Sequence, residues 1–424
     1  MHYKIKLIIF CFILLFMLTS CSESTQVAEM GIRLSEVDGC FVFVSAGHGT
    51  TFGILCDGSL WWWGRDLTRT YGFSTRLYRD ENGMFYGANA VEFDLDVVYV
   101  TSTGVSGNSQ ASSFALAITS EGTLWGWGRN AFGQLGDGSR QIRGTPIQIM
   151  ENVISVSAIG DSAFAVTSDG ALWAWGLDFL GLIDENIEVF TEPVHIMSDV
   201  FKVSSNSWHV LVLKTDGSLW GLGLTSLLGI GAAHKDGVPT AYIPITLEPV
   251  LVLSNVRYAS AGGFHSLAIC NDDYLWFWGN SRTGYYGELG WTLTKNINIL
   301  YPMIIKEQVQ KVDSGFVYFA AVTFDNTLYV WRILGPGTAI NKNLIYKNRI
   351  AFPKVKIKDD VSFVSISSSN NPFHTHFVMI KTDGSLVSFG NNIFGQLGTD
   401  QPFDGDFFET VRVHVPSQTC CNGQ

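Results

Sequence analysis

One octapeptide, present in seven copies, constrains the fold of this chain more than any other feature. The copies begin 47 to 64 residues apart, and the repeat averages about 54 residues. A repeat of this length indicates a chain built from one structural unit used seven times. The copies read DGSLWWWG from Asp57, EGTLWGWG from Glu121, DGALWAWG from Asp169, DGSLWGLG from Asp216, DDYLWFWG from Asp272, DNTLYVWR from Asp325 and DGSLVSFG from Asp383.

Each copy predicts a tight turn followed by a β-strand. Asp-Gly is a strong hairpin signal because glycine accepts the positive φ that a tight turn requires. In the third copy Leu172 and Ala174 share one face of the strand, while Trp173 and Trp175 share the other. Both faces are apolar, so both must be covered, as in a sheet that is stacked between two neighbouring sheets.

Three further strand-like segments accompany each octapeptide. In the third unit they are 153–157 and 163–167 before the turn, and the second unit shows a fourth segment at 145–149. Four strands per unit make a propeller blade. We therefore predict an all-β, seven-bladed β-propeller over 39–417, followed by a C-terminal tail at 418–424. The last strand, at 411–413, is expected to complete the sheet that starts at Phe41 and so to hide two edges.

The tryptophans are predicted to pack between blades. Eleven of the thirteen lie inside the octapeptides, one or more in six of the seven copies. A sugar or cofactor site would use such a residue once or twice, whereas a packing role explains its recurrence.

The full repeat resembles that of a known family. The order is V-x-x-V-S, a small-residue turn, the octapeptide, and a glycine loop written NAFGQLGDG at 130–138 and NIFGQLG at 392–398. This is similar to the regulator of chromosome condensation repeat, whose family forms seven-bladed propellers, and the likeness covers roughly 41–415. The fourth unit keeps only Leu227-Leu228-Gly229 of the loop, and the sixth departs after Trp331, so these blades are expected to be the least regular.

The first forty residues predict export and a lipid anchor. Lys4 and Lys6 precede an apolar run at 7–18, which is too short to span a bilayer and fits a signal peptide over 1–20. The sequence LTSC ending at Cys21 resembles a lipoprotein cleavage site, and 21–38 reads as a polar tether; an ordinary secretory signal is the alternative. We expect lipidation of Cys21 and a location in the cell envelope, at the outer membrane or cell surface.

Composition excludes a nucleic-acid partner. The chain holds 27 basic and 38 acidic residues, a net charge of −11, and no cluster of Lys and Arg that would follow a phosphate backbone. We expect a monomer that contacts the membrane only through its lipid.

No catalytic, metal or cofactor site is predicted. The familiar motifs of metalloproteases, serine hydrolases and nucleotide-binding loops are missing. The repeated acidic residues of the octapeptides are turn residues, since a catalytic carboxylate would break the repeat. His374 and His376 could face a metal together only with a third ligand from elsewhere. We therefore expect a protein that is not an enzyme.

The cysteines allow one disulfide between the ends of the ring. Cys40 precedes the first unit, and Cys420 and Cys421 follow the last, so a closed ring would bring Cys40 near one of the other two. Cys56 and Cys270 belong to blades that are not neighbours, and both are expected to be buried thiols.

Function is sought where the chain departs from the repeat. The longest insertion, between Gly64 and Val97, mixes aromatic residues with arginine, the composition of protein-binding hot spots; a packed loop over the rim is the alternative. The hypothesis is a non-catalytic scaffold that binds another protein through its rim loops. The resemblance also implies guanine-nucleotide exchange activity or inhibition of β-lactamases as possible roles, and a carbohydrate-binding surface protein is a further alternative. The predicted interface residues are Arg69, Tyr71, Phe73, Arg76, Tyr78, Phe85 and Tyr86.

Overall fold

The structure is a computed structural model. It describes residues 41–47, 49–64, 89–90, 96–104, 113–178, 189–206, 208–231, 245–280, 298–316, 318–332, 345–346, 349–350, 355–367, 375–392, 396–398 and 411–412. The predicted signal peptide, Cys21, the tether and the tail lie outside these residues. Among the helices of the described part, none is long and apolar enough to cross a membrane.

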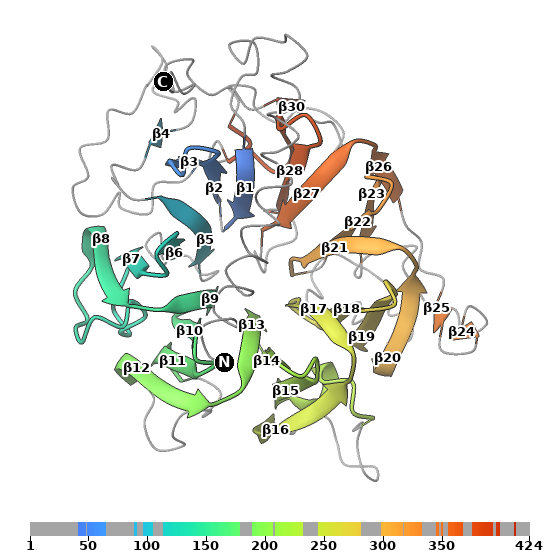
Figure 1. Ribbon diagram of the computed structural model, residues 1–424, viewed down its shortest axis with the longest axis horizontal. Coiled ribbons are helices and arrows are strands. Elements are labelled where there is room, and N and C mark those ends of the chain that lie inside the picture. Colours follow the sequence, from blue (N-terminus) through green and yellow to red (C-terminus); the bar gives the residue numbers. More distant parts are fainter. Residues whose placement is uncertain are drawn as a thin grey trace, which may run out of the picture.

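Seven sheets, each built on four antiparallel strands, surround a central axis, so the predicted all-β, seven-bladed propeller is confirmed (Figure 1). Each blade runs outward from an inner strand through a second and third strand to an outer strand. The inner strands are β1 (Phe41–Ala46), β5 (Val97–Gly104), β9 (Val153–Ile159), β13 (Val200–Asn206), β17 (Val256–Ala261), β21 (Val309–Ser314) and β27 (Val361–Ile366). The second strands are β2 (Thr50–Leu55), β6 (Ser113–Thr119), β10 (Ser162–Thr167), β14 (His209–Lys214), β18 (His265–Cys270), β22 (Tyr318–Thr323) and β28 (His376–Lys381).

The octapeptides form the third strand of every blade, as their sequence predicts. These strands are β3 (Leu60–Gly64), β7 (Leu124–Gly128), β11 (Leu172–Leu177), β15 (Leu219–Leu224), β19 (Leu275–Asn280), β23 (Leu328–Arg332) and β29 (Leu386–Gly390). The outer strands are β4 (Asn89–Ala90), β8 (Arg143–Met150), β12 (Val189–Met197), β16 (Ile245–Leu253), β20 (Asn298–Lys306), β26 (Val355–Lys358) and β30 (Val411–Arg412). A single 3₁₀ turn, Thr225–Leu227, stands in the described part of the fourth glycine loop.

The hydrophobic core lies between the blades. Phe52 and Trp62 of the first blade pack with Val100, Ala115 and Trp127 of the second in one cluster. Both faces of a blade are covered in this way, which explains the two apolar faces of the octapeptide. The predicted packing role of the tryptophans is confirmed for those that are almost fully buried, Trp63, Trp175, Trp278 and Trp331.

The outer strands carry two devices that discourage further pairing. Each of β8, β12, β16 and β20 contains one proline, at Pro146, Pro193, Pro249 and Pro302, which cannot donate a ladder hydrogen bond. The register between β7 and β8 also shifts twice, once on each side of Gly126. Prolines and bulges are common ways of protecting a sheet edge.

The ring closes by side-chain packing and hydrogen bonds, which corrects one expectation. β30 pairs with β29 and completes the seventh blade, and does not join the sheet that starts at Phe41. The inner, second, third and outer strands of each blade therefore follow one another along the chain and come from one repeat unit. Closure comes from a cluster that joins Phe41 and Trp63 to Val378 and Leu386, and from the bond of Phe41 N to Gly384 O at 3.3 Å.

One insertion adds strands to a neighbouring blade. Between β23 and β26 of the sixth blade, β24 (Ile345–Tyr346) and β25 (Arg349–Ile350) form a short hairpin. β25 pairs in parallel with β20 of the fifth blade, at Arg349 and Ile304. The fifth sheet therefore has six strands, and its outer strand β20 is paired at Ile304 (Figure 1).

Candidate functional site

The octapeptide turns form a hydrogen-bonded ring at one end of the propeller. Val97 N donates to Gly58 O at 3.0 Å, and Val153 N donates to Gly122 O at 2.7 Å. Equivalent bonds join every described turn to the first residue of the next inner strand, including the one that closes the ring at Phe41. The turns and the adjoining connections between outer and inner strands are called the turn face below.

The repeated aspartates shape their turns. Asp57 Oδ1 accepts hydrogen bonds from Ser59 N at 2.9 Å and from Ser59 Oγ at 2.6 Å. The side-chain hydrogen bond from Ser218, followed by that from its backbone N–H, holds the pKa of Asp216 below its usual value. The hydrogen bond from Thr167 Oγ1 is the largest of the effects that lower the pKa of Asp169. The prediction that these carboxylates are turn residues is confirmed, and their charge remains available at the surface.

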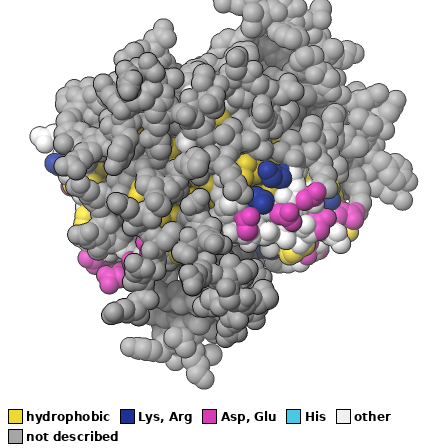
Figure 2. All heavy atoms as spheres, turned by 90° about the horizontal axis from the view of Figure 1, so that it is seen from above, with side chains coloured by type: hydrophobic (Ala, Val, Ile, Leu, Met, Phe, Trp, Pro, Cys, Tyr) yellow, Lys and Arg dark blue, Asp and Glu magenta, His cyan; other side chains and the backbone are white. Residues whose placement is uncertain are grey.

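The turn face is strongly acidic. The basic residues at this end are fewer and half-buried, and two of them are paired: Lys381 Nζ lies 3.2 Å from Asp383 Oδ2, and Arg257 Nη2 lies 2.8 Å from Asp273 Oδ1. In Figure 2, which views the ring from its side, Asp and Glu side chains gather along the lower part of the described surface. The exposed acidic residues of the turn face are Asp57, Asp96, Glu121, Glu151, Asp169, Asp199, Asp216, Asp272, Glu307, Asp325, Asp359, Asp360 and Asp383.

Two exposed aromatic residues interrupt the acidic surface. Phe201, the second residue of β13, is 44% exposed, and Phe324, in the sixth turn, is 52% exposed. Aromatic residues are enriched at protein interfaces. The turn face thus combines negative charge with apolar anchors.

Aromatic and lysine side chains meet around the axis behind the turn face. They come from the third residue of six of the seven inner strands and are half-buried, whereas the third blade has the buried Ser155 at this place. Lys202 Nζ lies 4.1 Å from the centroid of the Tyr258 ring, and the rings of Phe43 and Tyr99 lie 4.9 Å apart. Desolvation lowers the pKa of Lys202 to about 8, against the opposing effect of the Asp313 carboxylate. Burial, then Asp313, raises the pKa of Tyr99 to about 12.

The fifth residue of the inner strand links a blade to the next one in blades three to seven. Ser365 Oγ accepts from Ala46 N at 3.1 Å, and Ser204 Oγ accepts from Ala261 N at 3.0 Å. In the sixth blade Asp313 takes this place, and its Oδ2 accepts from Ile366 N at 2.8 Å. Desolvation raises the pKa of Asp313 to about 6 despite this bond. The serine of the V-x-x-V-S motif is therefore a link between blades, a role the sequence did not reveal.

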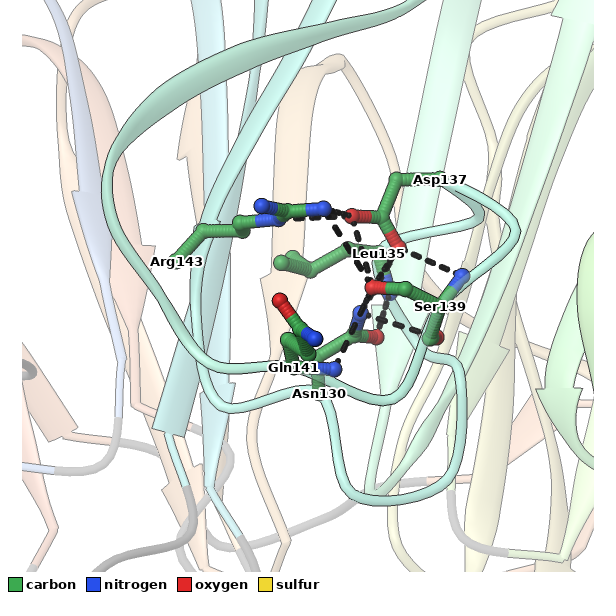
Figure 3. A network of polar contacts seen from close by, with 6 residues as sticks. All are labelled: Asn130, Leu135, Asp137, Ser139, Gln141 and Arg143. Carbon is green, nitrogen blue, oxygen red and sulfur yellow. Dashed lines mark hydrogen bonds and ion pairs between the residues drawn. The ribbon is translucent and has the colours of Figure 1, made fainter.

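A network of hydrogen bonds holds the glycine loop in its conformation (Figure 3). Asn130 Nδ2 donates to Asp137 Oδ1 at 2.8 Å and to Ser139 O at 3.0 Å, while Asn130 Oδ1 accepts from Leu135 N at 2.9 Å. Arg143 Nε donates to the other Asp137 oxygen at 2.7 Å. These hydrogen bonds explain why the loop sequence recurs.

The same loop fastens the second blade to the third. Gln134 Nε2 donates to Asp161 Oδ1 at 2.8 Å, and the indole of Trp175 donates to Gln134 O at 2.9 Å. The loop residues are therefore occupied by the fold.

Two buried histidines lie between neighbouring blades. His209 Nε2 and Ser266 Oγ are 2.7 Å apart. His265 stacks on Phe277 at 5.7 Å, and neither of its ring nitrogens has a hydrogen-bond partner among the described residues. Burial lowers the pKa of both histidines to about 3, and His209 adds a smaller effect on His265. Both residues are neutral packing groups at physiological pH.

The residues predicted for the interface and the disulfide lie outside the described part of the chain. This applies to the seven interface residues between Arg69 and Tyr86, to Cys40, Cys420 and Cys421, and to His374. His376 lies in the described part, where its Nε2 is 2.8 Å from Thr51 Oγ1 of the first blade. Across the described segments no group of three or more potential metal ligands occurs. Cys270 is buried as expected, whereas Cys56 is exposed because it lies in the first octapeptide turn.

Comparisons with known proteins agree with this architecture. The family described as regulator of chromosome condensation (RCC1) repeat matches residues 121–166. The regulator of chromosome condensation of Mus musculus is 26% identical over 171 residues, which is 40% of this chain and 38% of the relative. The Homo sapiens protein is 26% identical over 153 residues, 36% of this chain and 35% of the relative. The matches thus span little more than a third of the curated relatives.

Solved structures show the same fold over most of the chain. Human WBSCR16 superposes with a TM-score of 0.59 at 17% identity, covering 82% of this chain and 88% of that one. Yeast RCC1 (Prp20), solved bound to Kap60, superposes with a TM-score of 0.57 at 19% identity, covering 78% and 79%. Prp20p of Saccharomyces cerevisiae, in a study of its binding to Gsp1p and histones, gives 0.54 at 18% identity, covering 77% and 80%.

Proposed function

We propose that this chain, an RCC1-type repeat protein, is a non-catalytic scaffold that binds another protein. The observation that carries the proposal is the turn face, where exposed carboxylates surround the apolar anchors Phe201 and Phe324 on a rigid ring. Like charges held close together favour a partner of opposite sign. The partner proposed here is a protein with a basic surface and an apolar patch.

The rim insertion is proposed as a second part of the same interface. Its arginine and aromatic residues, from Arg69 to Tyr86, have the composition of binding hot spots. Solved propellers of this fold bind proteins, as the complex of yeast Prp20 with Kap60 illustrates for that protein.

We also propose that the protein acts in the cell envelope. The basic n-region, the apolar run at 7–18 and Cys21 support export and lipidation. Replacing Cys21 with serine should abolish incorporation of a labelled fatty acid into the protein. Incorporation that survives the replacement would remove the lipid anchor from the proposal.

Guanine-nucleotide exchange is the second candidate, because Prp20p was studied for binding to Gsp1p. The export signal argues against it, since GTP is a cytoplasmic ligand. A carbohydrate-binding role rests on no described residue, and binding to a glycan array would be needed to support it.

The test is affinity capture of envelope proteins with the mature chain, followed by binding kinetics with the protein identified. The triple variant Glu121→Lys, Glu151→Lys, Glu307→Lys should lower the association rate roughly tenfold at low salt. The single variant Glu192→Lys changes an exposed charge on the outer strand β12, away from the turn face, and is the control, with Glu121→Lys alone as its charge-matched counterpart on the turn face. Equal rates for the turn-face variants and the control would exclude the turn face, and capture of no protein by the wild type would overturn the scaffold role.

A further inference from the structure

On the outer strands of blades two to five, the residue that pairs with the first tryptophan of the octapeptide strand differs in polarity. Each of the residues Gln148, His195, Leu251 and Ile304 pairs with the first tryptophan of its octapeptide strand, so the four occupy the same place in blades two to five. Blades two and three have polar side chains there. Blades four and five have aliphatic ones.

The aliphatic position of the fifth blade is covered by another strand. Ile304 is the residue of β20 that pairs with Arg349 of β25. This pairing occurs two residues beyond Pro302, so the proline does not prevent strand addition at this position. A strand of the sixth-blade insertion thus pairs with the outer strand of the fifth blade at this aliphatic position.

The same edge of the fourth blade is open. β16 is the last strand of its sheet among the described residues. Three of its aliphatic side chains are exposed: Ile245 at 46%, Leu247 at 42% and Leu251 at 51%. By contrast, the exposed residues of β8 and β12 are polar: Thr145, Gln148, Glu192 and His195. Polar residues protect an edge from pairing, whereas exposed aliphatic residues beside unpaired backbone groups invite it.

We propose that β16 is a docking edge for an extended segment of a partner protein, which adds to the fourth blade in parallel as β25 adds to the fifth. Backbone hydrogen bonds near Leu251 would hold the segment, and its own aliphatic side chains would cover Leu247 and Leu251. The exposed Glu248 lies beside this site and favours a basic residue in the segment. The inference rests on the proposed protein-binding role and names a second surface for it.

A peptide with the sequence of residues 343–352, NLIYKNRIAF, is the probe, because it contains the strand that covers β20. For a Kd of about 1 mM, the peptide at about 2 mM occupies about two thirds of the molecules and should slow amide hydrogen exchange in β16 about threefold. Leu251→Gln introduces the polar residue of blade two and should abolish this protection. His195→Gln introduces the same residue at the equivalent place in blade three and should leave the protection of β16 unchanged.

Two results would overturn the inference: no protection of β16 by the peptide, or protection that survives Leu251→Gln. Because Leu251 is half exposed, the variant is expected to fold, and its unfolding midpoint checks this. Failure of the inference is separable from failure of the proposed function. If the wild type captures a protein whose binding is insensitive to Leu251→Gln, the scaffold role stands without the docking edge.

Discussion

The buried histidines should make this propeller sensitive to mild acid. His209 and His265 have folded pKa values of about 3, below the unfolded value of 6.5, because burial penalises the imidazolium. Between these values the unfolded chain binds more protons than the folded one. The stability these residues contribute is therefore fully present above pH 6.5 and is lost as the pH falls toward 3.

The size of the effect follows from the pKa difference. At pH 4.5 an unfolded histidine with a pKa of 6.5 is almost fully protonated, and the folded one is almost fully neutral. Because pH 4.5 lies two units below the unfolded pKa, each histidine lowers the free energy of unfolding by about 2.7 kcal/mol at that pH. At pH 7.5 this destabilisation is close to zero. The result depends little on the folded pKa, because pH 4.5 lies well above it.

His265→Phe tests this reasoning. The ring packs between Phe277 and Phe319, and its nitrogens have no hydrogen-bond partner in the described part of the chain, so an aromatic replacement retains the stacking. The variant should gain about 2.7 kcal/mol relative to wild type on moving from pH 7.5 to pH 4.5, measured by urea denaturation at both pH values. Any packing cost of the larger ring cancels in this difference. A gain below about 1 kcal/mol would refute the buried, neutral state of His265.

Two further predictions concern the repeat itself. Asn130→Ala removes three hydrogen bonds of the glycine loop and should lower the free energy of unfolding by about 2–4 kcal/mol. Gln141→Ala, at an exposed residue just after the loop, should change the free energy of unfolding by less than about 0.5 kcal/mol. Equal denaturation midpoints for the two variants would contradict the stabilising role of the hydrogen-bond network. Burial raises the pKa of Cys270 to about 11 and shields its thiol, whereas Cys56 is exposed. A maleimide should therefore label Cys56 in the native protein and Cys270 only after unfolding, as measured by mass spectrometry of the labelled peptides. Rapid labelling of Cys270 in the native protein would show that its blade opens.

The sequence alone determined the architecture because the repeat records each unit's local geometry. The Asp-Gly pair marks the turn, and the alternation of Leu172 and Trp173 shows that both faces are covered. Seven copies then give seven blades, and the recurrence of tryptophan identifies it as a packing residue. These properties depend on neighbours along the chain or in the adjacent blade, where every unit meets nearly the same environment.

Only the tertiary structure decided which residues meet across the ring or at its edges. Lys202 and Asp313 belong to blades four and six and interact only because all inner strands face one axis. The place of the last strand also had to be seen, since 411–412 could have paired with either end of the ring. Leu251 and Ile304 are both aliphatic and occupy equivalent positions of their blades. Leu251 is exposed, whereas Ile304 pairs with a strand of the hairpin from the sixth blade. Contacts of this kind join distant parts of the chain and leave no periodic signal, so the fold could be predicted from the sequence and these surfaces could not.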